Sequence, residues 1–256
     1  MSRPGAHNPG PVLVRFATAW LLLFGLAADA RTEPLVADLS SHLIAITTGF
    51  TGTEVLLFGA TEGEGDVIVV VRGPETEATV RRKRRVAGIW INTGGVTFER
   101  VPSFYAVASS GPLEKVVAPE VRAQQQIGVE HLQFQAPGDV SESRLRRYRA
   151  ALIQNKQQAG LFSREVGKVT FLGERLFRTS IYFPSNVPTG SYMVEVLLVR
   201  DGEVASAQTS PLIISKTGIG AEIFEFAHNQ SALYGVVAII GALVAGWTAH
   251  LVFRRI

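Results

Sequence analysis

The strongest hydrophobic pattern in the chain is an uninterrupted apolar stretch near its C-terminal end. Ser231 to Phe253 contains no Asp, Glu, Lys or Arg. At about 1.5 Å per residue, a helix of this length crosses the roughly 30 Å hydrocarbon core of a bilayer with some tilt. Tyr234 and Trp247 lie toward its opposite ends, where amphipathic rings favour the membrane interfaces. A helix in a globular core is the alternative, but such helices are seldom apolar on every face. We therefore expect a transmembrane helix at residues 231–253.

The residues after this stretch indicate its orientation. Arg254 and Arg255 follow directly, and positively charged residues are retained on the cytoplasmic side of membrane helices. The tail 254–256 is therefore expected in the cytoplasm. This predicts a single-pass protein of the bacterial cytoplasmic membrane with its main domain in the periplasm.

A second, shorter apolar run lies near the N-terminus. Phe16 to Ala28 follows Arg3 and Arg15, and Ala28-Asp29-Ala30 has the small-x-small pattern of a cleavage site. A run of this length is too short to span the bilayer comfortably. It predicts a signal peptide at residues 1–30 with the mature chain beginning near Arg31. An uncleaved signal anchor is the alternative.

Between the two ends, the first part of the chain has the pattern of β-strands. Short apolar runs with turn signals between them occur at residues 43–48, 55–58, 67–71, 78–80, 89–92, 96–98 and 104–108. This spacing favours a β-sandwich of the immunoglobulin-like class, here over residues 31–117. Val67 to Val71 is β-branched throughout, which is typical of a strand buried on both faces or central in a sandwich.

The pattern changes in the middle of the chain and then returns to strands. Residues 118–162 are rich in Gln, Arg, Ala and Glu, and Leu145, Tyr148 and Leu152 form a helical stripe surrounded by arginines. A second β portion is expected at 163–217, with a hairpin turn at Asp201-Gly202. Residues 218–230 then form a juxtamembrane segment. Both one β domain and two remain compatible with this order.

Composition narrows the classes of partner and chemistry. The net charge is only +3 and is dispersed, so nucleic acid is not expected as a partner. The chain has no cysteine, which excludes disulfides, thiolate metal sites, a cysteine nucleophile and a lipoprotein anchor. A helix must therefore hold the protein in the membrane.

The most distinctive local feature is a run of five positive charges, Arg81, Arg82, Lys83, Arg84 and Arg85. A buried strand cannot carry such a run, because burying unpaired charge costs several kcal/mol. We expect an edge strand, a hairpin end or an exposed loop. The run either blocks edge-to-edge aggregation of sheets or contacts an anion such as lipid headgroups, a cell-wall polymer or an acidic partner. Trp90, with Phe98, Phe104 and Tyr105, is expected in the core.

Small residues recur within the apolar C-terminal stretch. Ala238, Ala242 and Gly246 are spaced four apart, and so are Gly241, Ala245 and Ala249. Small residues on one stripe let two membrane helices approach closely. The stripe is a candidate face for self-association or for contact with another membrane protein.

Motifs that would indicate catalysis are missing. The sequence has no phosphate-binding loop of the G-x-x-x-x-G-K-[ST] type, no G-x-S-x-G elbow and no H-E-x-x-H pair. His42, His131, His228 and His250 share no ligand spacing, and Glu62, Glu64 and Asp66 fit an acidic hairpin turn better than a calcium loop. No catalytic residue, metal or cofactor is therefore expected, and the chain is interpreted as a non-enzyme.

Four segments resemble a known family. They are GFTGTEVLLFGA at 49–60, DVIVVVRGP at 66–74, GIWIN at 88–92 and VPSFYAV at 101–107. They are similar to the alphaproteobacterial putative transmembrane protein family, which is uncharacterised and supplies no catalytic motif. The resemblance implies a signal peptide, an exported domain and a C-terminal span, and an accessory role beside a permease.

Together these features favour an envelope accessory or interaction protein held in the membrane. Its partner would be another membrane protein such as a permease, or a second copy of the chain. A periplasmic module that binds an anionic ligand or polymer through the basic run is the alternative.

Overall fold

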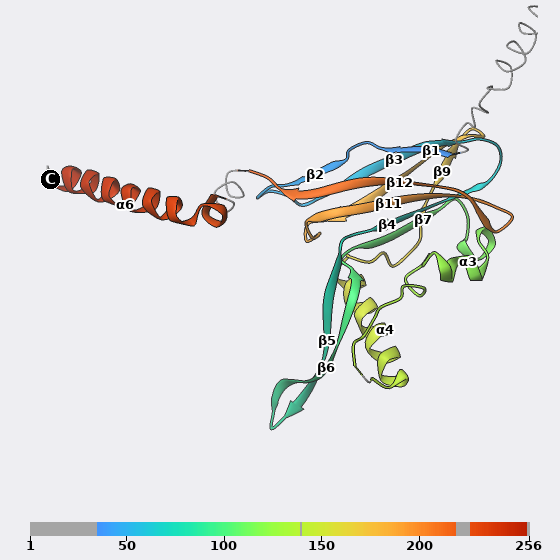
Figure 1. Cartoon of the computed structure of the whole chain (residues 1–256), viewed down its shortest axis with the longest axis horizontal. Helices are drawn as coiled ribbons and strands as arrows, with labels where there is room; N and C mark the ends of the chain where they lie inside the picture. Colours follow the sequence, from blue (N-terminus) through green and yellow to red (C-terminus); the bar gives the residue numbers. More distant parts are fainter. Residues whose placement is uncertain (1–34, 139, 219–225, 255–256) are drawn as a thin grey trace, which may run out of the picture. The chain divides into compact units, whose positions relative to one another are not determined.

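The computed structural model describes residues 35–138, 140–218 and 226–254, and it is mainly β, as predicted. The predicted signal peptide at 1–30 lies outside these residues. Strands β1 (Leu35–Leu39), β3 (Gly52–Thr61), β10 (Leu176–Pro184) and β9 (Thr170–Leu172) form one sheet in that order. Strands β2 (Leu43–Ile46), β12 (Glu203–Lys216), β11 (Gly190–Arg200), β4 (Asp66–Arg72), β7 (Tyr105–Ser109) and β8 (Gly167–Lys168) form the second. The two sheets face each other in Figure 1.

The strand order confirms the predicted immunoglobulin-like sandwich. The first segment of the domain divides between the sheets, because β1 pairs with β3 whereas β2 pairs in parallel with the last strand, β12. A tyrosine corner is also present, since the Tyr192 hydroxyl near the start of β11 donates to the Pro188 carbonyl oxygen at 2.6 Å. Two residues later, where antibody domains place a disulfide cysteine, this chain has the fully buried Val194.

The two β portions of the sequence combine into one sandwich. In the first sheet β3 pairs along its whole length with β10, which comes more than a hundred residues later in the chain. In the second sheet β4 pairs with β11. Each sheet thus contains strands from both portions, and the segment between them is an insertion after β7.

Strand β4 is buried on both faces, as its β-branched sequence predicted. Val67, Val69 and Val71 lie in the core between the sheets, together with Phe177, Phe183 and Tyr192. Ile68 and Val70 point the other way into a second core on the outer face of the second sheet. Both faces of β4 are buried because the strand lies between β11 and β7 in the second sheet and beneath a helical cover.

The inserted segment forms this cover. It contains three helices, α2 (Leu113–Val116), α3 (Pro119–Gln124) and α4 (Glu142–Gln158). Leu113, Val121 and Leu152 from these helices pack in the second core around Tyr105. The Tyr105 hydroxyl makes two hydrogen bonds there: it donates to the Gln126 carbonyl oxygen at 2.7 Å and accepts from the Gly128 amide at 2.8 Å. Burial raises the pKa of Tyr105 to about 12.

The last helix, α6 (Ser231–Phe253), has the bounds predicted for the transmembrane segment. It is the one helix among the described residues that is long and apolar enough to cross a membrane. None of its side chains is buried in the protein. An apolar helix left uncovered by protein is suited to a hydrocarbon environment.

Replacing Tyr105 with Phe should destabilise the domain by about 1–3 kcal/mol, because it leaves the Gly128 amide and the Gln126 carbonyl without their buried partner. Thermal unfolding of the full chain in detergent would measure the loss. Tyr182→Phe is the matched control, since Tyr182 is 55% exposed. Equal effects of the two substitutions would contradict a structural role for the Tyr105 hydroxyl.

Candidate functional site

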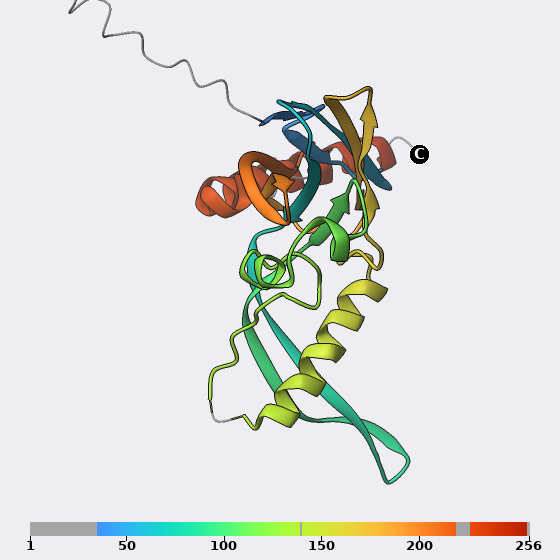
Figure 2. The same ribbon diagram turned by 90° about the vertical axis from the view of Figure 1, so that its right-hand side faces the viewer.

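The candidate site lies on a long hairpin that grows out of the second sheet. Strands β5 (Glu75–Val86) and β6 (Ile89–Pro102) form a two-stranded sheet of their own and are called the arm here. The arm prolongs the β4–β7 pair, because β5 follows β4 after Gly73-Pro74 and β6 precedes β7. Figures 1 and 2 both show it lying alongside α4.

The junction between sheet and arm is tightly fixed. Gly73 donates to the Phe104 carbonyl at 2.8 Å, and Ser103 donates to the Pro74 carbonyl at 2.8 Å. A Cβ atom at Gly73 would lie 2.4 Å from the Ser103 hydroxyl oxygen, so only glycine allows this close crossing. From the last turn of α4, the Lys156 ammonium also donates to the Ser103 carbonyl at 3.3 Å.

The half of the arm nearest the sandwich is held in place by packing. Val80, Val96 and Phe98 are buried in the second core with Leu152 of α4. The Phe98 ring meets Phe134 edge-on with centroids 6.0 Å apart. Together, these contacts make the base of the arm part of the folded domain.

The outer half of the arm carries the five predicted cations. Arg81 to Arg85 all lie on β5 and are all exposed, which fits the expected hairpin end. Successive side chains of a strand point to opposite faces, so the charges divide between both sides of the arm. A bulge at Gly94 (φ 57°) shifts the register between Arg81 and Arg82.

The expectation that Trp90 belongs to the core is wrong. Trp90 is 66% exposed at the end of the arm, whereas Phe98, Phe104 and Tyr105 are buried as predicted. The four residues are close in sequence but lie at different places in the structure. Trp90 is near the turn of the arm and Phe98 near its base, whereas Phe104 and Tyr105 follow the arm, with Tyr105 starting β7. An aromatic-rich stretch alone does not show where a hairpin leaves the core.

A cleft of about 650 Å³ opens between the arm and α4. Arginines enter it from both sides: Arg81, Arg82 and Arg84 from β5, and Arg144 and Arg147 from α4. The rest of its described lining is Val80, Thr93, Gly94, Tyr148 and Ala151, and this lining includes no carboxylate. The Arg144 guanidinium lies 5.5 Å from the centre of the Tyr148 ring and 3.5 Å from the Gly95 carbonyl oxygen.

The sequence did not reveal the contribution of α4. Arg144 and Arg147 were recognised only as charges around a helical stripe, and they are about sixty residues from the basic run. Their spacing did indicate that the two arginines share a helix face, because residues three apart are neighbours on a helix surface. In the structure, the apolar stripe on the same helix packs against the arm.

Among the residues that the structure describes, no ion pair joins an arginine of the cleft to a carboxylate. Arginine does form ion pairs elsewhere in the domain, at Arg72–Glu195, Arg100–Glu75 and Arg122–Glu114, and none of these residues lines the cleft. Guanidinium groups present planar forks of donors that match the oxygens of phosphate and carboxylate. The geometry is therefore suited to holding an anionic group between the arm and α4.

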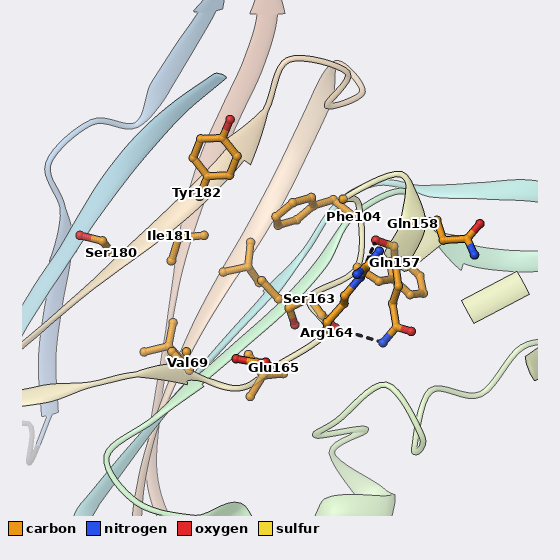
Figure 3. A pocket seen from close by; sticks show the side chains of 17 residues that line it. Val69, Phe104, Gln157, Gln158, Ser163, Arg164, Glu165, Ser180, Ile181 and Tyr182 are labelled. Atoms are coloured by element: carbon orange, nitrogen blue, oxygen red, sulfur yellow. Dashed lines mark hydrogen bonds between the residues drawn. The ribbon is translucent and has the colours of Figure 1, made fainter. Parts of the chain in front are cut away.

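A second hollow of about 480 Å³ lies at an open edge of the sandwich (Figure 3). Val69, Val71, Phe104 and Ile181 give it an apolar lining. The polar groups at its rim bond to one another: the Gln157 amide donates to the Ser163 carbonyl at 3.3 Å, and Arg164 donates to the Gln157 carbonyl at 3.4 Å. Among the described residues, no group of three or more His, Asp or Glu side chains is placed to hold a metal ion.

The small residues predicted for helix association lie on α6. Ala238, Gly241, Ala242, Ala245 and Gly246 are all exposed, and a Cβ atom added at Gly241 or Gly246 would meet nothing within 4 Å. This face is open to a neighbouring helix.

An immunoglobulin-like sandwich followed, in the described residues, by one apolar helix of spanning length is the architecture of a membrane-anchored protein. Comparison with family models gives the particular family. The chain belongs to the family described as Putative transmembrane protein (Alph_Pro_TM), whose model matches residues 34–255 and so covers the sandwich, the arm and α6. None of the curated proteins matches the chain.

Replacing Arg82 and Arg84 together with Gln should leave the melting temperature unchanged or raise it by about 1–3 °C at low salt, because the change relieves repulsion among unpaired cations. The gain should vanish near 1 M salt, where the screening length is about 3 Å. Thermal unfolding at both salt concentrations would measure it.

Arg72→Gln provides the contrast, since Arg72 is bonded to Glu195 and to the Gln125 carbonyl, both at 2.6 Å. That substitution should lower the melting temperature. A similar drop for the Arg82 and Arg84 substitutions would show that these arginines serve the fold.

Proposed function

We propose that this chain is a non-enzymatic accessory protein of the bacterial cell envelope that recognises an anionic partner through its arm. α6 holds it in the cytoplasmic membrane, and the sandwich and arm lie in the periplasm. The observation that carries the proposal is the cleft in which five arginines from β5 and α4 meet with no carboxylate in the described lining.

This arrangement favours an anion site over simple protection of a sheet edge. Edge protection requires only that charges be present along β5, and it gives no reason for α4 to add two more. Gathering like charges in one cleft is unfavourable unless a ligand neutralises them. Folded proteins keep such clusters where they bind phosphate or carboxylate groups.

The membrane part of the proposal rests on α6. Its small-residue face fits close contact with another helix, from a permease or from a second copy of the chain. Arg254 directly after the helix supports a cytoplasmic C-terminus. With this orientation the arm meets its partner outside the cytoplasm.

The orientation can be tested cleanly because the chain has no cysteine. A cysteine at the exposed Glu174, in the turn before β10, should react with a membrane-impermeant maleimide in spheroplasts. A cysteine appended after Ile256 should react only once the membrane is permeabilised. The reverse labelling pattern would place the arm in the cytoplasm and overturn the proposal.

Anion recognition can be tested with inorganic polyphosphate and the full chain in detergent. Changing Arg81, Arg82, Arg84 and Arg85 to Gln should weaken binding at least tenfold at low salt, because four of the charges that attract the anion are lost. It should also flatten the dependence of affinity on salt. Titration calorimetry over a salt series would measure both.

A matched control removes four exposed cations from other parts of the domain, by Lys168→Gln, Arg175→Gln, Arg178→Gln and Lys216→Gln. This variant has the same net charge as the arm variant and should keep most of the affinity. Equal loss in the two variants would mean that polyphosphate responds to overall charge, and the arm would then not be a site.

A further inference from the structure

The end of the arm is apolar, and the proposed anion site does not account for it. Residues 86–91, Val-Ala-Gly-Ile-Trp-Ile, contain no charged side chain. Ile89 is 68% exposed and Trp90 66%, which makes them the most exposed large apolar side chains among the described residues outside α6. Val86 and Ile91 are also exposed. These six residues are called the tip here.

The tip is presented in a fixed conformation. Val86 pairs with Ile89 across a tight turn in which Ala87 and Gly88 both have positive φ angles, 51° and 88°. The Arg85 guanidinium closes the turn by donating to the Gly88 carbonyl at 3.2 Å. The tip is therefore a tight turn closing a fully paired hairpin whose base is packed in the second core.

The cations form a collar that begins level with the inner residues of the tip and continues behind it. Arg85 is opposite Trp90 and Arg84 is opposite Ile91, and Lys83 and Arg82 follow at about 3.4 Å per residue. Val86 and Ile89 therefore stand at the extreme end of the arm, Trp90 and Ile91 are level with Arg85 and Arg84, and Lys83 and Arg82 lie behind them. Because successive side chains alternate, the charges occupy both faces. The arginines of α4 extend the collar along one side.

This layering matches the layers of an anionic bilayer surface. Hydrocarbon lies innermost, indole rings favour the interface, and phosphate groups lie just outside it. A soluble polyanion would satisfy the cations and leave the tip in water. An apolar pocket on a partner would cover the tip, but it would need a complementary acidic rim around both faces of the arm.

We propose that the tip inserts into the interface of a bilayer containing anionic phospholipids, with the collar of Arg81 to Arg85 on the headgroup phosphates. This inference rests on the proposed recognition of anions by the arm and names the partner. The arm then gives the protein a second contact with a lipid surface, separate from α6.

The test uses the full chain reconstituted in nanodiscs of phosphatidylcholine and probes it with separate vesicles. Flotation should show binding to vesicles that contain phosphatidylglycerol and little binding to phosphatidylcholine vesicles, because each cation near an anionic surface adds to the affinity. Changing Ile89, Trp90 and Ile91 to Thr should weaken vesicle binding about tenfold or more, through lost apolar burial. The same variant should bind polyphosphate like the wild type.

The matched control changes three equally exposed apolar residues elsewhere in the domain, by Val36→Thr, Leu176→Thr and Met193→Thr. These substitutions should leave vesicle binding unchanged. Equal loss in the control and the tip variant would show that general surface hydrophobicity drives binding, and would overturn the inference.

Insertion itself can be read from Trp90 without altering the tip. The chain has three tryptophans, so Trp20→Phe with Trp247→Phe leaves Trp90 as the reporter. Its emission should shift to the blue and be quenched by brominated lipid placed only in the phosphatidylglycerol vesicles. Binding without shift or quenching would refute insertion.

The two proposals fail in different ways. A chain that binds polyphosphate but no vesicle would keep anion recognition and refute lipid insertion. A chain that binds neither would refute both.

Discussion

The domain depends on one strand, β4, whose side chains enter two cores at once. Val67, Val69 and Val71 pack between the sheets, and Ile68 and Val70 pack beneath the helical cover. A strand that is apolar on both faces does not define its own register. Shifting it by one residue would still place apolar side chains in both cores. The register is instead fixed at its ends. The Ser110 hydroxyl donates to the Asp66 carboxylate at 2.6 Å, and Gly73 bonds to Phe104 at the other end.

The same strand determines where the arm lies. Because β4 and β7 are neighbours and the chain between them continues the pairing, the hairpin leaves the sheet in a direction set by the Gly73–Phe104 crossing. α4 then packs on the base of the hairpin and contributes two arginines to the cleft. The site thus combines a local feature of sequence, the basic run, with a tertiary one, the position of a helix inserted sixty residues later.

Several features could be predicted because they depend on local pattern. The bounds of α6 followed from an absence of charge, the two-sided burial of β4 followed from its β-branched run, and the exposure of Arg81 to Arg85 followed from the cost of burying charge. The convergence of Arg144 with Arg82 could not be predicted, because it arises from packing between distant segments. The exposure of Trp90 was missed for a related reason: hydrophobicity indicates burial only where another element is available to cover the side chain, and no element in the described part of the chain covers the end of this hairpin.

The core between the sheets also has a consequence for how the protein matures. In antibody domains a disulfide links the sheets beside the tyrosine corner, whereas here Val194 follows the Tyr192–Pro188 bond and packs with Val55 and Leu57. Stability therefore comes from apolar packing, with no disulfide to form during folding. Folding of this domain requires no thiol oxidant and no disulfide isomerase, so none of its bonds depends on whether the surrounding compartment is reducing or oxidising.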